Sequence, residues 1–374
     1  MWYQPPFAMR RLFARFLLSV VLLATPLAHG GTPAEDSVFV YDVFAGAPDC
    51  AAIRQRLARL PLRPTVILSV EQGAEFVLDR PAGERQLRCA LAELRHTSRR
   101  ARAMLLQDIG FLRNQEEAVR RVRRLAQLAS RTGGLAGMVV DIEPYLDPRW
   151  ACAPAAVRRD IMASYVELLR KLRAAKGRLP LEAAVPWWFA SPEVDGSSVV
   201  AALDGVYVMV YGDEGGPLVG GRAQRVLERV PPKGGFFDGT RVHVALAPYE
   251  AESPAHFGRE IAHLRQRYAH TRGWAGVAVF HAGSAYGVPL VRSLAGVVQD
   301  AHGAAVAGAV VEFSGKKAQT DVCGQFSFRG MTEAEGELVV SKPGFRGVTV
   351  KLRLAPPGAA TEVPPIRLEG VTRS

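Results

Sequence analysis

Two carboxylates separated by one residue end an apolar segment near the middle of the chain. The segment runs from Gly137 to Tyr145 and reads GMVVDIEPY, so Asp141 and Glu143 directly follow its apolar half. On a β-strand, residues two apart point to the same side, which would bring both carboxylates together. Like charges in a poorly solvated site repel and separate their pKa values. The pair is therefore suited to sharing a proton, or to holding one acid protonated for general-acid catalysis.

Strand-like and helix-like segments alternate between about residues 36 and 291. The helical patterns cover 51–60, 85–96, 116–131, 155–175 and 254–270, and the apolar strand-like runs cover 38–43, 65–70, 103–109, 137–142, 181–188, 206–211, 242–248 and 276–280. This count and length predict an α/β fold, a (β/α)8 TIM barrel, over 36–291. The alternative is a doubly wound open sheet. Its glycine-rich first turn is missing, because the first strand is followed by FAGAP at 44–48.

Acids and aromatic residues gather at the predicted C-terminal ends of these strands, where parallel barrels place their chemistry. Aromatic rings stack on the apolar faces of sugars, while carboxylates act on glycosidic oxygens. The pattern therefore predicts a glycan as substrate or ligand. Strand alternation lets one of the two adjacent tryptophans face a cleft while the other packs in the core. Besides Asp141 and Glu143, the candidate site residues are Asp42, Asp108, Trp187, Trp188, Tyr211, Asp213, Tyr249, Glu250 and His281.

The strand carrying Asp141 resembles that of the chitinase-type glycoside hydrolases (family 18), which reads D-G-x-D-x-D-x-E. Glu143 and Asp141 match the last two acids and Gly137 matches the glycine, whereas Ala136 and Val139 replace the earlier aspartates. The resemblance implies that Glu143 is the general acid. It also implies that Asp141 orients the N-acetyl group of the substrate, which acts as the nucleophile.

The sixth strand adds a second match to the same family, whose pattern there is Met-x-Tyr-Asp. Met209 and Tyr211 fit it, and Asp213 stands one residue late. The resemblance implies that Tyr211 supports the N-acetyl group.

Two departures from that family change the chemistry we expect. Val139 lacks the carboxylate that shares a proton with the next aspartate, and His281 follows Phe280 where the family has a tryptophan. A two-carboxylate mechanism is the natural substitute, with Glu143 as the acid and Asp213 or Glu250 as nucleophile or base. A carboxylate separation of about 5–5.5 Å would give retention, and about 6.5–9.5 Å inversion.

Other interpretations use the same residues. The degenerate motif also suits a non-catalytic carbohydrate-binding protein on a chitinase-like barrel. A metal-assisted enzyme could use Asp42, Asp108, Asp141, Glu143 and His281. In simpler interpretations, His281 is a core histidine, and Asp42 and Asp108 hold the barrel rim through loop amides. We predict no cofactor and no bound metal.

The pattern changes after about residue 292 to short alternating strands separated by turn residues. The runs 294–299, 309–313, 325–328, 337–341 and 348–354 predict a small all-β sandwich over 293–370. The sandwich resembles the carboxypeptidase regulatory-like (transthyretin-like) family through GVVQD at 296–300, GAVV at 308–311, Gly324, Phe326 and KPGF at 342–345. The resemblance implies an accessory module without peptidase chemistry.

The N-terminus and the charge indicate where the protein works. Arg10 and Arg11 precede an apolar run over 16–24, and small residues follow at 28–31. This order predicts a signal peptide over 1–31, export, and no stable membrane span after cleavage; the alternative is a membrane anchor. The 47 basic and 36 acidic side chains give a formal charge of +11. This charge suits an acidic partner or basic groups spread over solvated surfaces, and no nucleic-acid motif accompanies it.

The basic clusters at 99–102 and 120–124 are expected to be a solvated loop and a solvated helix face, respectively. The cysteines, Cys50, Cys89, Cys152 and Cys323, contain no CxxC pair, which disfavours a zinc site. Cys50 and Cys89 fall on the first two predicted helices. They would form a disulfide in an oxidising compartment or remain as two buried thiols.

Overall fold

Eight parallel strands close into a barrel in the computed structural model, with β10 returning to pair with β1. The model describes residues 35–60, 64–72, 75–147, 149–150, 154–190, 196–210, 240–248, 254–280, 292–331, 333–355 and 360–371. The barrel strands are β1 (Ser37–Val40), β2 (Thr65–Ser69), β5 (Arg100–Leu105), β6 (Leu135–Val140), β7 (Leu181–Pro186), β8 (Gly205–Met209), β9 (Arg241–Leu246) and β10 (Trp274–Val279). The predicted (β/α)8 barrel is confirmed.

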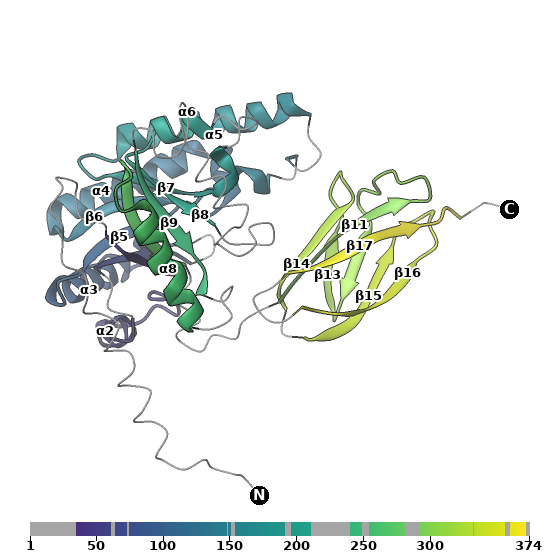
Figure 1. Cartoon of the computed structure of the whole chain (residues 1–374), viewed down its shortest axis with the longest axis horizontal. Coiled ribbons are helices and arrows are strands. Elements are labelled where there is room, and N and C mark those ends of the chain that lie inside the picture. Colours follow the sequence, from purple (N-terminus) through teal and green to yellow (C-terminus); the bar gives the residue numbers. More distant parts are fainter. Residues whose placement is uncertain are drawn as a thin grey trace, which may run out of the picture. The chain divides into compact units, whose positions relative to one another are not determined.

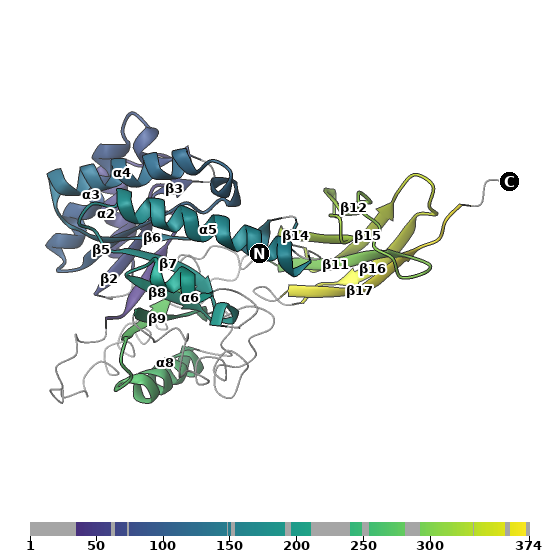
Figure 2. The same ribbon diagram turned by 90° about the horizontal axis from the view of Figure 1, so that it is seen from above.

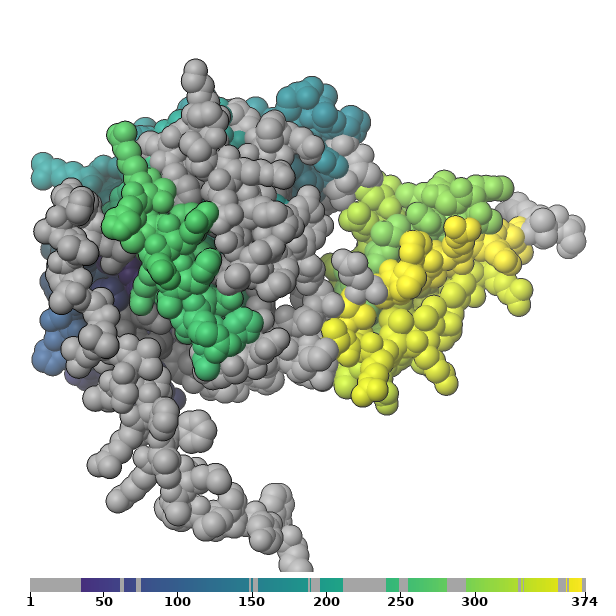
Figure 3. Space-filling view, viewed as in Figure 1, coloured from purple at the N-terminus to yellow at the C-terminus, as the bar shows by residue number. Residues whose placement is uncertain are grey.

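Helices lie outside the ring of strands (Figures 1 and 2), and α8 lies on the surface in Figure 3. They are α2 (Cys50–Ala58), α3 (Gly83–His96), α4 (Gln115–Thr132), α5 (Ala155–Ala175), α6 (Gly196–Ala201) and α8 (Pro254–Tyr268). Short elements at the strand ends are β3 (Glu71–Gln72), β4 (Glu75–Phe76) and the 3-10 helices η2 (Val77–Asp79), η3 (Ile109–Leu112), η4 (Pro144–Leu146) and η5 (Trp187–Ala190). None of the described helices is long and apolar enough to cross a membrane.

Helix α4 shows how the sequence sets the ends of these helices. The Asn114 side chain accepts a hydrogen bond from the Glu117 amide at 3.3 Å, and Glu116 and Glu117 favour the positive end of the helix dipole. The helix ends at Gly133, whose φ of +63° suits glycine.

Alternate residues of the strands build two apolar layers. Val38 and Val40 belong to the large cluster between strands and helices, whereas Phe39 belongs to a second cluster inside the barrel. Full burial of such a side chain stabilises the fold by about 1.5–3 kcal/mol. The interior cluster consists of Phe39, Ile67, Met104, Val139, Ala184, Tyr207, Met209, Ala245 and Ala278.

A buried ion pair fills the N-terminal half of the barrel interior. Arg102 of β5 and Glu182 of β7 are 2% and 0% exposed and contact each other directly. Glycine makes room for them, because a Cβ on Gly205 would lie 3.0 Å from Glu182 Oε1. The expectation that residues 99–102 form a solvated loop is wrong. Strand β5 begins at Arg100, and Arg102 is a strand residue whose charge is neutralised inside the barrel.

His243 of β9 lies in the same buried region and gives the fold an expected acid sensitivity. It is 1% exposed and stacks on Tyr207 with ring centres 4.4 Å apart. Burial, and then the charges of Arg102 and Arg241, hold its pKa well below the ordinary 6.5. Below about pH 6.5 this histidine therefore binds a proton in the unfolded chain but not in the folded chain, so stability falls as the pH drops.

We expect His243→Phe to flatten the fall in melting temperature between pH 7 and pH 5. Phenylalanine keeps the ring stacked on Tyr207 but cannot take up a proton. The exposed His96 provides the control, since His96→Gln should leave the slope unchanged. A slope equal to that of the wild type in His243→Phe would contradict this assignment.

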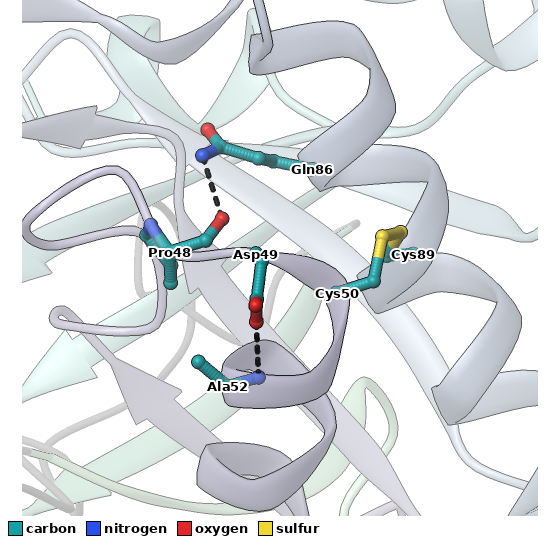
Figure 4. Close-up of a disulfide and its surroundings, with 6 residues drawn as sticks. All are labelled: Pro48, Asp49, Cys50, Ala52, Gln86 and Cys89. Atoms are coloured by element: carbon teal, nitrogen blue, oxygen red, sulfur yellow. Dashed lines mark hydrogen bonds between the residues drawn. A yellow bond between two sulfur atoms is a disulfide. The ribbon is translucent and has the colours of Figure 1, made fainter.

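A disulfide joins the first two outer helices, as one of the two alternatives for these cysteines predicted. Cys50 of α2 and Cys89 of α3 are bonded, with their Cα atoms 5.5 Å apart (Figure 4). Asp49 caps α2 by accepting from the Ala52 amide at 2.8 Å, and Gln86 of α3 donates to the Pro48 carbonyl at 2.8 Å. The start of α2 is thus fixed to α3 by covalent and polar contacts.

Cys323 is also disulfide-bonded. Because Cys50 and Cys89 bond each other, Cys152, which lies outside the described residues, is the remaining cysteine of the sequence. We therefore expect a tryptic digest of the unreduced chain to contain peptides 150–158 and 318–329 joined by a disulfide. Mass spectrometry checks this. Recovery of both peptides as free thiols, or of a disulfide-linked dimer, would contradict it.

The C-terminal segment forms two β-sheets over one apolar core. One sheet has the order β14 (Gln325–Met331), β11 (Arg292–Asp300), β17 (Ala360–Leu368). The other has the order β13 (Lys316–Gln319), β12 (Val310–Phe313), β15 (Glu335–Ser341), β16 (Val348–Arg353). The sequence pattern omitted β13, a polar edge strand, and β17, which contains two prolines.

Candidate functional site

Asp141 and Glu143 lie just beyond the C-terminal end of β6, on the side of the barrel interior. Val139 belongs to the interior cluster, while Val140 and Ile142 belong to the outer one. The alternation thus continues past the strand and directs Asp141 inward, and its amide still donates to the Leu105 carbonyl of β5 at 3.2 Å. Both acids are partly buried. This is the arrangement expected from their spacing.

The environment of Asp141 strongly favours its protonated form. Its pKa is raised from 3.8 to about 7, first because the carboxyl is buried, then by the charge of Glu143, and then by that of Glu71. Near neutral pH the Asp141 carboxyl is therefore protonated about half of the time, beside a second acid. A proton that is retained at pH 7 and can be passed on is what general-acid catalysis requires.

Two tyrosines interact with the acids, and neither is among the site residues predicted from the sequence. The Tyr145 hydroxyl donates to Glu143 Oε1, so it holds that carboxylate in place. Tyr165 of α5 is fully buried, and the charges of Asp141 and Glu143 raise its pKa beyond the effect of burial, which keeps its hydroxyl protonated. Tyr145 stands two residues after Glu143, which was a usable signal. Tyr165 shows only as an apolar position in a helical pattern.

A third acid, Glu71, lies at the end of β2 and is 3% exposed. It accepts from Arg121 Nη1 of α4 at 2.7 Å and from the Gln107 amide at 3.0 Å. Arg121 is itself only 8% exposed, so the prediction of a wholly solvated face over 120–124 is wrong at this position. The reason is that Glu71 and Glu117 neutralise its charge in place of water.

The contacts of three other predicted site residues, Asp108, Asp42 and Trp187, contribute to the structure of the barrel. Asp108 is exposed and caps η3, accepting from the Gly110 amide at 2.6 Å, which matches its simpler interpretation as a rim residue. Asp42 is partly buried after β1, and its carbonyl accepts from Arg56 at 2.9 Å. Trp187 is 6% exposed in the outer cluster, so it is the core member of the tryptophan pair expected from strand alternation.

The remaining candidates cannot be placed beside the pair. Tyr211, Asp213, Tyr249, Glu250 and His281 lie outside the described residues, as does the side chain of Trp188. Within the described ranges, no cluster of three or more histidine, cysteine or acidic side chains could hold a metal ion.

Solved chitinases resemble the fold of the chain at low sequence identity. A GH18 chitinase from Pseudoalteromonas aurantia aligns at 11% identity and TM-score 0.44, over 67% of this chain and 95% of its own. Catalytic domain 2 of the Group II chitinase from Ostrinia furnacalis aligns at 16% identity and TM-score 0.37, over 57% of this chain and 64% of its own. The barrel assignment itself follows from the strand order described above.

A smaller part of the chain resembles a different solved protein. The 3-chlorocatechol 1,2-dioxygenase from Rhodococcus opacus aligns at 15% identity and TM-score 0.18, over 22% of this chain. The match spans 60% of the dioxygenase, less than two thirds of its length. No curated protein matches the sequence.

The C-terminal domain has a clear family. Residues 293–369 match the family model described as the carboxypeptidase regulatory-like domain. This range covers both sheets of the C-terminal segment and the turn at Asp300, whose carboxylate accepts from the amides of His302 and Ala304 at 2.8 and 2.9 Å. The resemblance stated from the sequence is confirmed, and residues 293–369 form a carboxypeptidase regulatory-like domain.

Proposed function

We propose that this protein is an exported glycoside hydrolase that acts on a polysaccharide or an amino-sugar glycan, with Glu143 as the general acid. The observation that supports it best is the pair at the mouth of the barrel. The pKa of Asp141 is raised to about 7, and Glu143 lies next to it with a hydrogen bond from Tyr145. A pair in which one acid still binds a proton near neutral pH can protonate the oxygen of a leaving sugar.

The two acids take different roles in this proposal. Asp141 follows Val139 of the barrel interior and is the inner member, so it holds the proton and raises the proton affinity of the pair. Glu143 lies further along the chain, beyond the strand end, and delivers the proton to the glycosidic oxygen. Asp213 or Glu250 would supply the nucleophile or base, and Tyr211 would support an N-acetyl group if the substrate carries one.

Export is part of the proposal. The basic residues before the apolar run at 16–24 support a signal peptide. The Cys50–Cys89 disulfide fits an oxidising compartment outside the cytosol. N-terminal sequencing of the mature protein should locate the cleavage close to residue 31.

A non-catalytic glycan-binding protein is the second candidate. Val139 occupies an apolar interior position where the chitinase-type motif has an acid, so one carboxylate of that motif is replaced by core packing. Incubation with chitin, β-glucan and amino-sugar polymers distinguishes the two candidates. New reducing ends and shortened products support the hydrolase. Affinity for one of these glycans without any product supports the binding protein.

A further inference from the structure

Glu71 and Arg121 form a buried ion pair that the proposed chemistry does not use. The two side chains are 1% and 10% exposed, and Arg121 Nη1 lies 2.7 Å from Glu71 Oε1. Arg121 Nε also donates to Glu117 at 2.7 Å. Its guanidinium lies 5.3 Å from the ring centre of Phe76 and 4.9 Å from that of Phe111. Arg121 therefore holds the Glu71 carboxylate in one place by a charge-assisted hydrogen bond.

Glu71 and Asp141 flank the end of the same strand. In the barrel order, β5 lies between β2 and β6. Glu71 accepts from the Gln107 amide, just after β5, at 3.0 Å, and the Asp141 amide donates to Leu105, the last residue of β5. Neighbouring strands are about 4.8 Å apart, so strands β2 and β6 are about 10 Å apart. Leu106, which lies between Leu105 and Gln107 in the chain, has a φ of +61°. Residues other than glycine adopt this conformation where surrounding contacts impose it.

We propose that Glu71 is an electrostatic positioning residue of the candidate site: its carboxylate, held in place by Arg121 and the Gln107 amide, favours the protonated form of Asp141. This inference rests on the proposed function of the pair. The groups that act on Asp141 are Glu143, next to it on the chain, and Glu71, at the end of β2. The buried Tyr165 hydroxyl is neutral, so it adds no charge. Buried charges are poorly screened by salt, so a fixed negative charge two strands away still acts.

The variant Glu71→Gln tests the proposal, because it removes the charge and keeps the size of the side chain and one of its two acceptor oxygens. We expect the titration midpoint of Asp141 to fall by about one pH unit. The midpoint is measured by NMR on protein labelled with ¹³C in the aspartate carboxyls, and the signal is identified by its loss in Asp141→Asn. This readout needs no turnover. A protein that cleaves no glycan would refute the proposed function, yet the titration would still test Glu71.

The matched control is Glu117→Gln. Glu117 also contacts Arg121 at 2.7 Å, and its exchange for glutamine removes the same charge. Unlike Glu71, Glu117 is not one of the groups that raise the pKa of Asp141. Its variant should keep the wild-type midpoint. An unchanged midpoint in Glu71→Gln, or equal shifts in both variants, would overturn the proposal. If Glu71→Gln does not fold, Glu71→Ser removes the same charge with a smaller polar side chain and leaves Arg121 paired with Glu117. Its Asp141 midpoint should also fall, and an unchanged value would overturn the proposal.

Discussion

Glu143→Gln should lower the rate of glycan cleavage by about 10²–10⁴-fold, which is the usual contribution of a general acid. Glutamine keeps the size of the side chain and an oxygen that can accept the Tyr145 hydrogen bond, but it carries no transferable proton. We expect KM to change much less than kcat, since the proton moves only in the transition state. The measurement is the release of reducing ends under steady-state conditions.

The control for this variant is Glu84→Gln, the same exchange at an exposed glutamate on α3 that pairs with Arg88. It should leave kcat unchanged. If Glu143→Gln cleaves the glycan at the wild-type rate, Glu143 is not the acid. A substrate with a good leaving group sharpens the test. It needs little protonation of its leaving oxygen, so the variant should recover much of its rate on that substrate.

The barrel could be predicted from the sequence because its signal is repeated. Each of the eight strands gives an apolar run, and five of these runs are followed by a helical pattern, so small errors at single ends do not alter the count. The helix over 155–175 has the predicted bounds. The third strand shows the limit. The predicted run of 103–109 is observed at Arg100–Leu105, because arginine was taken as a sign of solvent while Arg102 pairs with Glu182 inside the barrel.

The site could be predicted only in part, for a related reason. The spacing of Asp141 and Glu143 follows from strand geometry and is visible in one short segment. Glu71 acts on Asp141 from another part of the chain, Tyr165 of α5 is influenced by both acids, and Arg121 of α4 contacts Glu71. Only the tertiary packing brings these residues together. Trp187 could be predicted only as one of two alternatives. Strand alternation requires one of the two adjacent tryptophans to pack in the core, and Trp187 lies in the outer cluster.

Asp141→Asn should stabilise the folded protein above pH 7, although it removes a residue of the proposed site. The pKa of Asp141 is about 7 in the fold, against 3.8 as its ordinary value. Between pH 4 and pH 7 the unfolded chain therefore releases a proton that the folded chain keeps, so stability decreases as the pH rises through this window. One pKa unit corresponds to about 1.4 kcal/mol. Because Asp141 is partly exposed, we expect the variant to gain on the order of 2–4 kcal/mol at pH 8.

Urea unfolding at pH 5 and at pH 8 measures this effect. From pH 5 to pH 8 the free energy of unfolding of the wild type should decrease relative to that of Asp141→Asn, because asparagine has no proton to release. Asp160→Asn, the same exchange at an exposed position of α5, should follow the wild type at both pH values. Equal pH dependence in Asp141→Asn and the wild type would contradict a raised pKa in the fold. A gain in stability together with a loss of glycan cleavage in Asp141→Asn would show that the proton of this destabilising acid is used by the site. Functional residues often reduce stability in this way in exchange for activity.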